Sequence, residues 1–279
     1  MSETPDHPLS DAEKTDWLRL IRSTNVGPIT FFKLLQRFGT AAAALDALPD
    51  LSRRGGGKAI KPASRASAER EREKLDRAGA KLIAWGEPGY PPLLHHIEDP
   101  PPLISVLGHG HLLSKKSIAV VGARNCSING RKFARSMAAG LGAGGLMICS
   151  GMARGIDAEA HLGALDTGTV AVLAGGIDIV YPKENQALYE QIIERGALIS
   201  EIPTGMKPQA RHFPRRNRII SGMARGVVVI EASPRSGSLI TARMALDQGR
   251  EVFAVPGAAG DPRARGTNHL IRQGAAVCE

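Results

Sequence analysis

Three arginines stand close together in the stretch FPRRNRIISGMARG, which covers residues 213–226. Arg215, Arg216 and Arg218 open an apolar segment that is expected to be helical. Cations at the start of a helix oppose its macrodipole, so they do not stabilise the helix itself. An anion held by both the guanidinium groups and free backbone N–H groups would account for them. The alternative is a solvated arginine face without a ligand.

The region that contains this stretch alternates strand-like with helix-like segments. Near-continuous apolar runs, typical of parallel strands buried on both faces, occupy 117–122, 146–150, 169–174, 197–201, 226–232 and 251–255. Helices are predicted between them, at 128–142, 158–166, 185–195, 214–224 and 238–248. The pattern predicts an α/β fold with a doubly wound, mostly parallel Rossmann-like sheet.

Ligands bind to such a sheet outside the carboxyl ends of its strands. The six loops after the predicted strands each carry at least one Arg or Lys, and most carry glycines. A strand of linked phosphates would need cations on so many loops, whereas a single nucleotide would not. The sequence therefore predicts a basic cleft for a polynucleotide. The expected contacts are Arg124, Gly151, Arg154, Gly155, Lys183, Asn185, Phe213, Arg215, Arg216, Asn217, Arg218, Ser236, Gly237 and Ser238.

Aromatic residues make up only 4% of the chain, and Phe213 and Tyr181 are the candidates for base stacking. Few stacking residues and many cations predict weak sequence preference and a steep dependence of binding on salt. A duplex fits less well, because no helix is evidently free to enter a major groove.

Motifs for other ligands and for catalysis are absent. GARNCSING, after the first predicted strand, is not the G-x-G-x-x-G fingerprint of a dinucleotide site, and no Walker A loop occurs. No cofactor and no catalytic residue are predicted. A metal site is not predicted either, because the histidines at 95, 96, 109 and 111 lack carboxylate or thiol companions at ligand spacing. Carboxylates near strand ends have structural alternatives: Asp157 can cap the next helix, and Glu201 and Glu231 can pair with arginines.

Bulk composition favours either a polyanionic partner or an acidic surface as the binding partner, and a cytoplasmic location. The chain has 279 residues, 36 of them basic and 27 acidic, and a net charge of +9. Its three cysteines are scattered without metal-ligand spacing, which favours free thiols in a reducing compartment. No apolar run approaches the length of a membrane span, so no membrane contact is expected.

The remaining sequence predicts four segments. A disordered leader is expected at 1–15, a small helical domain at 16–80 with a mobile basic loop at 52–68, a proline-rich connector at 81–115, and the Rossmann-like domain at 116–279. In the helical domain, residues 24–28 are expected to form a turn in which Gly27 is free to take a positive φ and Pro28 suits the first turn of a helix. This turn resembles a helix-hairpin-helix, although an ordinary small helical domain would use it equally well.

Seven motifs resemble the DNA-processing protein A family, also called DprA or Smf. They are VGARxxSxxG at 121–130, SGMARGID at 150–157, YPKEN at 181–185, FPRRNRIISG at 213–222, SGSLITARMA at 236–245, GREVFAVPG at 249–257 and GTNHLIRQGA at 266–275. The resemblance implies a cytoplasmic bacterial homodimer that binds single-stranded DNA. It also implies protection of incoming DNA and loading of a RecA-type recombinase in natural transformation. The family's DNA contacts fall on Arg124, Lys183 and 215–218, whereas Ala123 and Asn129 depart from its usual serine and tyrosine.

The related Rossmann-like fold of nucleotide phosphoribohydrolases offers an alternative function, an enzyme acting on nucleotides. Their signature P-G-G-x-G-T-x-x-E would align with residues 234–243. Arg243 or a neighbour then stands in the place of the essential glutamate, which favours a binding protein over a hydrolase.

Overall fold

The computed structural model describes residues 8–54 and 61–279. They form two compact units, the first made of residues up to Tyr90 together with Glu98–Ser105, and the second of Pro91–Ile97 and Val106–Glu279. The proline-rich segment expected at 81–115 is therefore not a separate connector. Its residues are shared between the two units, and the boundary falls inside strand β2 (Leu103–Gly108).

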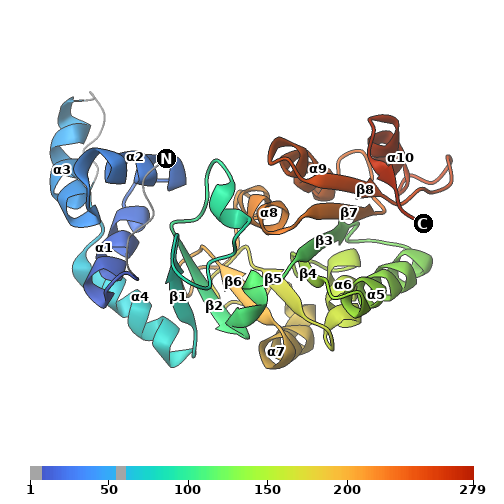
Figure 1. Ribbon diagram of the computed structural model, residues 1–279, viewed down its shortest axis with the longest axis horizontal. Helices are drawn as coiled ribbons and strands as arrows, with labels where there is room; N and C mark the ends of the chain where they lie inside the picture. The colour runs from blue at the N-terminus through green and yellow to red at the C-terminus, as the bar shows by residue number, and fades with distance from the viewer. Residues whose placement is uncertain (1–7, 55–60) are drawn as a thin grey trace. The chain divides into compact units, whose positions relative to one another are not determined.

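The first unit is mainly helical (Figure 1). Its elements are α1 (Asp11–Arg22), α2 (Pro28–Phe38), α3 (Ala41–Arg54), α4 (Arg65–Arg77) and β1 (Lys81–Ala84). Helix α1 begins earlier than expected because Ser10 and Glu13 form a capping box: Ser10 Oγ accepts from the Glu13 N–H, and the Glu13 carboxylate accepts from the Ser10 N–H at 2.8 Å. The expected leader at 1–15 is thus wrong for its last residues, and residues 1–7 lie outside the described part.

The turn between α1 and α2 does not use the freedom of Gly27 to take a positive φ. Asn25 takes the left-handed conformation with a φ of 61°, whereas Gly27 has a φ of −98° and precedes the helix as its N-cap. Pro28 begins α2 as predicted. The ring of Trp17 in α1 packs edge-on against Phe31 in α2, with centroids 5.0 Å apart, so the turn closes a helical hairpin over an aromatic contact.

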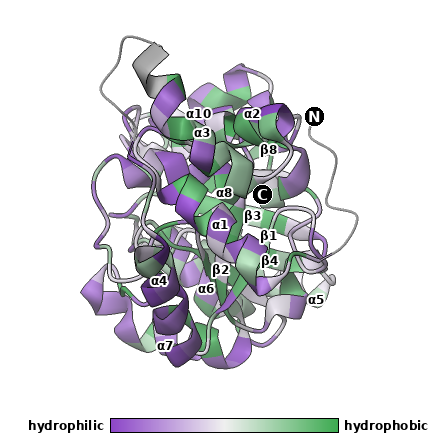
Figure 2. Ribbon diagram, turned by 90° about the vertical axis from the view of Figure 1, so that its left-hand side faces the viewer, coloured by the Kyte–Doolittle hydropathy of each residue, from purple (hydrophilic) through white to green (hydrophobic). Residues whose placement is uncertain are grey.

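The predicted basic loop at 52–68 is shorter than expected. Helix α3 reaches Arg54 and α4 begins at Arg65, after the N-cap residue Ser64, while residues 55–60 lie outside the described part. Figure 2 shows α4 as a predominantly hydrophilic helix. The half-buried ion pair between Arg22 and Glu71, at 2.8 Å, joins α1 to this charged helix.

The second unit contains the predicted parallel sheet, which confirms the α/β fold. Its strands are β3 (Ser117–Gly122), β4 (Met147–Ser150), β5 (Thr169–Val172), β6 (Ala197–Ser200), β7 (Gly226–Ile230), β8 (Glu251–Ala254) and β9 (Ala276–Val277). They pair in parallel in the order β6–β5–β4–β3–β7–β8–β9. The chain moves outward from β3 to β6 and returns to place β7 beside β3. Such a reversal of strand order opens a crevice at the carboxyl edge.

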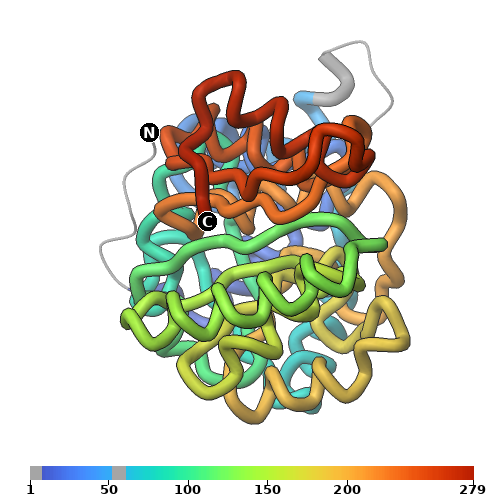
Figure 3. The backbone as a smooth tube through the Cα atoms, turned by 90° about the vertical axis from the view of Figure 1, so that its right-hand side faces the viewer, coloured from blue at the N-terminus to red at the C-terminus, as the bar shows by residue number. Residues whose placement is uncertain are grey.

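Helices cover both faces of this sheet. They are α5 (Ile128–Ala143), α6 (Ile156–Ala164), α7 (Gln186–Arg195), α8 (His212–Met223), α9 (Gly237–Asp247) and α10 (Arg265–Arg272), with short 3₁₀ turns η1 (Leu94–His96), η2 (Gly110–Ser114) and η3 (Lys183–Asn185). Helices α5, α6 and α7 lie on one face, and α8 and α9 on the other (Figure 1). Figure 3 shows the unit from its β9 side, where the chain ends. Among the described residues, no helix is long and apolar enough to cross a membrane.

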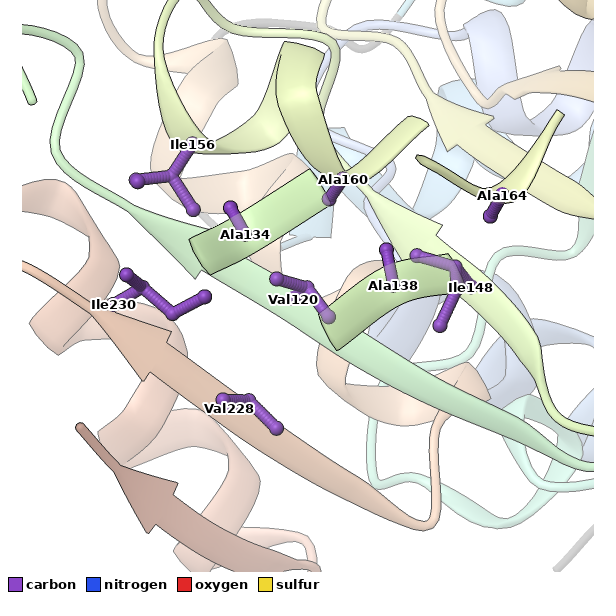
Figure 4. Close-up of a cluster of buried hydrophobic side chains, with 9 residues drawn as sticks. All are labelled: Val120, Ala134, Ala138, Ile148, Ile156, Ala160, Ala164, Val228 and Ile230. Carbon is purple, nitrogen blue, oxygen red and sulfur yellow. The ribbon is translucent and has the colours of Figure 1, made fainter. Parts of the chain in front are cut away.

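Small residues let α5 and α6 pack closely over the sheet. Val120, Ile148 and Val228 from the strands meet alanines of the two helices in one buried cluster (Figure 4). A Cβ added to Gly163 of α6 would lie 2.2 Å from the Arg135 carbonyl oxygen of α5, so a larger residue there would separate the helices.

Replacing Ile148 by alanine should lower the free energy of unfolding by about 2–5 kcal/mol, because the side chain is fully buried and its loss leaves a cavity. The matched variant Ile128→Ala removes the same atoms from a side chain that is 73% exposed, and should change stability by less than about 0.5 kcal/mol. Urea unfolding measures both. Equal losses in the two variants would contradict the assignment of the core.

Candidate nucleic-acid interface

A cavity of about 520 Å³, here called the strand-end cleft, lies at the carboxyl edge of the sheet. The loops after β3, β4 and β7 and the start of α8 form its walls. These are the strands between which the sheet order reverses, as the topology requires. Four arginines from different segments line it: Arg124, Arg216, Arg235 and Arg263.

A smaller cavity of about 40 Å³, the inner pocket, adjoins the cleft. Arg124 and Phe213 line both cavities, and Arg154 and Tyr181 line the inner pocket. The Arg124 guanidinium lies over the Phe213 ring, 5.2 Å from its centroid, and the Tyr181 ring lies 5.6 Å from Phe213. An exposed cation and two aromatic rings therefore meet where the cavities join.

The arginine run of α8 divides into exposed and buried members. The side chain of Arg215 is 45% exposed, and its Nε lies 3.0 Å from Glu201. The side chain of Arg218 is only 5% exposed and contacts the other oxygen of Glu201 at 2.5 Å. Glu201 thus pairs with arginines as predicted. The expectation that Arg218 reaches a phosphate needs correction, because this guanidinium is held inside the protein.

Arg216 is also buried, and its guanidinium joins two strands to α8. It donates to the carbonyl oxygens of Gly151, directly after β4, and Val172 in β5. Its Nε donates to Asn217 Oδ1 at 3.2 Å. Burial lowers the pKa of Arg216 to about 10, which the charge of Asp157 partly opposes, so the group stays charged at neutral pH. Arg216 and Asn217 line the cleft, but both residues are buried.

Asp157 does not cap α6 as expected. Its carboxylate instead accepts from the backbone N–H groups of Gly151 at 3.2 Å and Ala153 at 3.4 Å, which closes the loop after β4. Burial raises the pKa of Asp157, and the nearby Arg216 charge opposes this rise. The carboxylate and the guanidinium therefore support the same loop from two sides.

Gly155 and Asn185 hold this loop in place. Gly155 has a φ of 78°, and a Cβ there would lie 2.4 Å from the Ala123 carbonyl oxygen, so only glycine fits. Asn185 Nδ2 donates to the Met152 carbonyl at 2.9 Å. Both residues were expected to contact the ligand. The structure gives them internal contacts that position Arg154, whose half-exposed side chain lies 3.6 Å from Glu184.

The remaining expected residues lie at the cavities or beside them. Ser236, Gly237 and Ser238 line the cleft at the start of α9, where the Ser236 side chain caps the helix. Lys183 is exposed in η3, next to the residues that line the inner pocket. The expected set omitted Arg235 and Arg263. Both lie in loops that follow predicted strands, and this same criterion selected Arg124.

Two further expectations concern carboxylates and metals. Glu231 accepts hydrogen bonds from the backbone N–H of Ser127, at 2.8 Å, and from its hydroxyl, so its expected pairing with an arginine is replaced by a contact with α5. Within residues 8–54 and 61–279, no group of histidines, cysteines and carboxylates is arranged to hold a metal ion.

The doubly wound parallel sheet, with a cleft lined by arginines at its strand ends, places the second unit among Rossmann-like domains. The family model of DNA recombination-mediator protein A matches residues 81–279, and that of the DprA-like N-terminal HHH domain matches residues 11–73. The chain belongs to the DNA recombination-mediator protein A (DprA/Smf) family. The predicted resemblance is confirmed, and so is the helix-hairpin-helix interpretation of the first unit.

Individual relatives agree with this assignment. Protein Smf of Escherichia coli is 45% identical over 204 residues, which cover 72% of this chain and 54% of that protein. The chain therefore spans about half of that relative's length. The solved structure of DprA from Streptococcus pneumoniae is 33% identical with a TM-score of 0.78, covering 98% of this chain and 95% of that one.

A second solved structure concerns the ligand directly. It describes the single-stranded DNA binding mode of DprA from Helicobacter pylori. That chain is 27% identical to this one with a TM-score of 0.66, and the match covers 71% of this chain and 90% of the other.

The buried His161 of helix α6 should make the protein sensitive to acid. Burial lowers its pKa to about 3, with a smaller contribution from the Arg216 charge. Between pH 6.5 and 3 the unfolded chain therefore binds a proton here and the folded chain does not. The free energy of unfolding should fall as the pH is lowered through this window, by about 1.4 kcal/mol per pH unit from this group.

Urea unfolding of wild type and His161→Asn across this pH range measures the effect. The variant should show a smaller decline, whereas His269→Asn, which changes a histidine that is not buried, should follow the wild type. A decline as steep in His161→Asn as in the wild type would contradict the assignment.

Proposed function

We propose that this chain binds single-stranded DNA along the strand-end cleft and acts in DNA processing during natural transformation. The observation that carries the proposal is the junction of the two cavities, where Arg124 lies over Phe213 beside Tyr181. A cation for a phosphate and rings for bases are the two elements that unpaired nucleic acid requires. The Helicobacter pylori relative, whose solved structure describes a single-stranded DNA binding mode, supports the same ligand.

The accessible cations define where the phosphates would lie. Arg124, Arg235 and Arg263 are accessible around the cleft, and Arg154, Lys183 and Arg215 extend this charge along the neighbouring loops. Backbone N–H groups at the start of α9, around Gly237, add uncharged donors. Together these groups follow several strand ends, which suits a chain of linked phosphates better than one nucleotide.

Three of these cations already have a carboxylate partner. Arg154 lies 3.6 Å from Glu184, Arg215 lies 3.0 Å from Glu201, and Arg263 lies 2.9 Å from Asp261. All three arginine side chains are about half exposed, so a phosphate can approach without displacing any of the ion pairs completely. These pairs orient the guanidinium groups before DNA arrives. The oriented arginines lose less conformational freedom when DNA binds, but the carboxylates lower the net positive charge at this edge of the sheet.

A single strand fits this surface better than a duplex does. Helix α8, which carries the arginine run, is buried along most of its length, so it is not free to enter a major groove. The aromatic rings at the cavity junction need unstacked bases. We therefore infer tighter binding to single-stranded DNA than to duplex of the same sequence.

The finer biological role rests on the family relationship. We infer that the protein is a cytoplasmic homodimer that protects incoming DNA and helps to load a RecA-type recombinase. The name of the family, a recombination mediator, supports the recombinase partner. Sedimentation of the purified chain tests the dimer, and pull-down with a RecA-type protein in the presence of oligonucleotide tests the partner.

Replacing Arg124 by alanine should weaken binding of a labelled thymidine oligonucleotide by about 1–3 kcal/mol, because a charge-assisted phosphate contact is lost. The slope of log affinity against log salt should also become shallower, by about 0.7 for one phosphate. The matched control is Arg225→Ala, which removes an exposed arginine directly before β7, at the opposite edge of the sheet. Equal effects of the two variants would show that the cleft is not the site.

An enzymatic function is tested separately. Arg243, which stands near the place of the hydrolase glutamate, is exposed on α9 and does not line the cleft. Incubation of the protein with nucleoside monophosphates should therefore release no free base. Base release that disappears in Asp157→Asn would instead favour the phosphoribohydrolase alternative, because Asp157 is a carboxylate that lines the cleft.

A further inference from the structure

A third cavity, of about 230 Å³, lies at the same edge of the sheet beyond the ends of β7 and β8. We call it the β7–β8 cavity. Helix α5 and the segment that enters α10 complete its walls, and it shares no lining residue with the strand-end cleft. Its residues therefore have no part in the phosphate contacts described above.

The chemistry of this cavity differs from that of the cleft. Phe133, Val255 and Pro256 give it apolar walls, while Glu231 and Asp261 bring two carboxylates to its lining. Hydrogen bonds from Arg263 hold the pKa of Asp261 below its usual value, so this group is ionised at neutral pH. Carboxylates repel a phosphate and accept hydrogen bonds from N–H donors. The cavity therefore suits a flat, largely apolar molecule that carries amino groups.

Glu231 is fixed in position at one side of this cavity. Both of its oxygens accept from Ser127, one from the backbone N–H at 2.8 Å and the other from the hydroxyl. A Cβ added to Gly130 would lie 2.6 Å from Glu231 Oε1, so the absence of a side chain there makes room for the carboxylate. Each carboxylate oxygen thus accepts one hydrogen bond from Ser127, whereas a carboxylate oxygen can accept two.

The cavity adjoins the cleft through one ion pair. Arg263 lines the cleft, Asp261 lines the β7–β8 cavity, and their side chains meet at 2.9 Å. A polynucleotide whose phosphates lie at Arg263 would thus bring a base to the entrance of this cavity. The exposed Arg263 lines only the cleft, and its ion pair with Asp261 links the two sites.

We propose that the β7–β8 cavity is a base subsite, which takes an unstacked nucleobase with an exocyclic amino group from single-stranded DNA held in the cleft. The proposal rests on the proposed function. Glu and Asp carboxylates accept from the amino group of cytosine, whereas thymine presents a carbonyl oxygen at that position and would be repelled. Among pyrimidines of equal size, the subsite therefore selects cytosine over thymine.

Titration of the full chain with labelled oligo(dC) and oligo(dT) of equal length tests this selection. The wild type should bind oligo(dC) about tenfold more tightly, within the range for one specific base contact. Asn129→Phe fills the cavity from an exposed position on α5, and Glu231→Gln replaces the carboxylate, which only accepts, by an amide that also donates and so no longer discriminates against a carbonyl oxygen. Each should bring the ratio of the two affinities close to one while oligo(dT) binding stays unchanged. Ala139→Phe places the same ring at an exposed position of α5 outside the cavity, and should keep the wild-type ratio.

The outcomes separate this proposal from the proposed function. Salt-dependent binding of both oligonucleotides with equal affinity in the wild type would overturn the base subsite and leave the cleft intact. A preference for oligo(dC) that survives in Asn129→Phe would also overturn it, because the base would then bind elsewhere. Failure to bind either oligonucleotide would overturn both proposals.

Discussion

The buried guanidinium of Arg216 is the interaction on which the strand-end cleft depends. It joins the carbonyl groups of Gly151 and Val172 to helix α8, and so fixes the edges of β4 and β5 relative to that helix. A Cβ at Gly151 would lie 2.4 Å from the Arg216 Nη1, so the loop can approach this closely only with glycine. Loss of the guanidinium would leave two buried carbonyl groups without a donor and Asp157 without its nearby positive charge, a far larger cost than the loss of a surface charge.

This internal charge lets the exposed cations be held by rigid segments. Arg124 follows β3, Arg235 follows β7 and Arg215 projects from α8, and residues of all three segments line the same cleft as the loop that Arg216 supports. Carboxylates at the edge, such as Glu201 and Asp261, orient arginines without cancelling the positive cleft. Buried arginines therefore hold the edge together, and exposed arginines surround the cleft.

Sequence analysis predicted the sheet and its carboxyl edge because buried parallel strands have near-continuous apolar runs, which are visible locally. It could not predict that Arg215 is exposed and Arg218 buried. Both arginines contact Glu201, which lies at the end of another strand, so their burial depends on the tertiary fold. The roles of Gly155 and Asn185 were hidden for the same reason, because their partners lie on other loops. The early start of α1 could have been predicted, because the S-D-A-E capping box that begins at Ser10 is a local sequence signal.

The most direct test of the central claim is amide hydrogen exchange of the chain with and without an oligo(dT) that saturates it. Exchange should slow in the loops after β3, β4 and β7, at residues 122–125, 151–155 and 233–238, which surround the cleft. Peptides at the opposite edge, around Arg225 and Lys116, should be unaffected. Protection confined to that opposite edge or to the first unit would contradict the account.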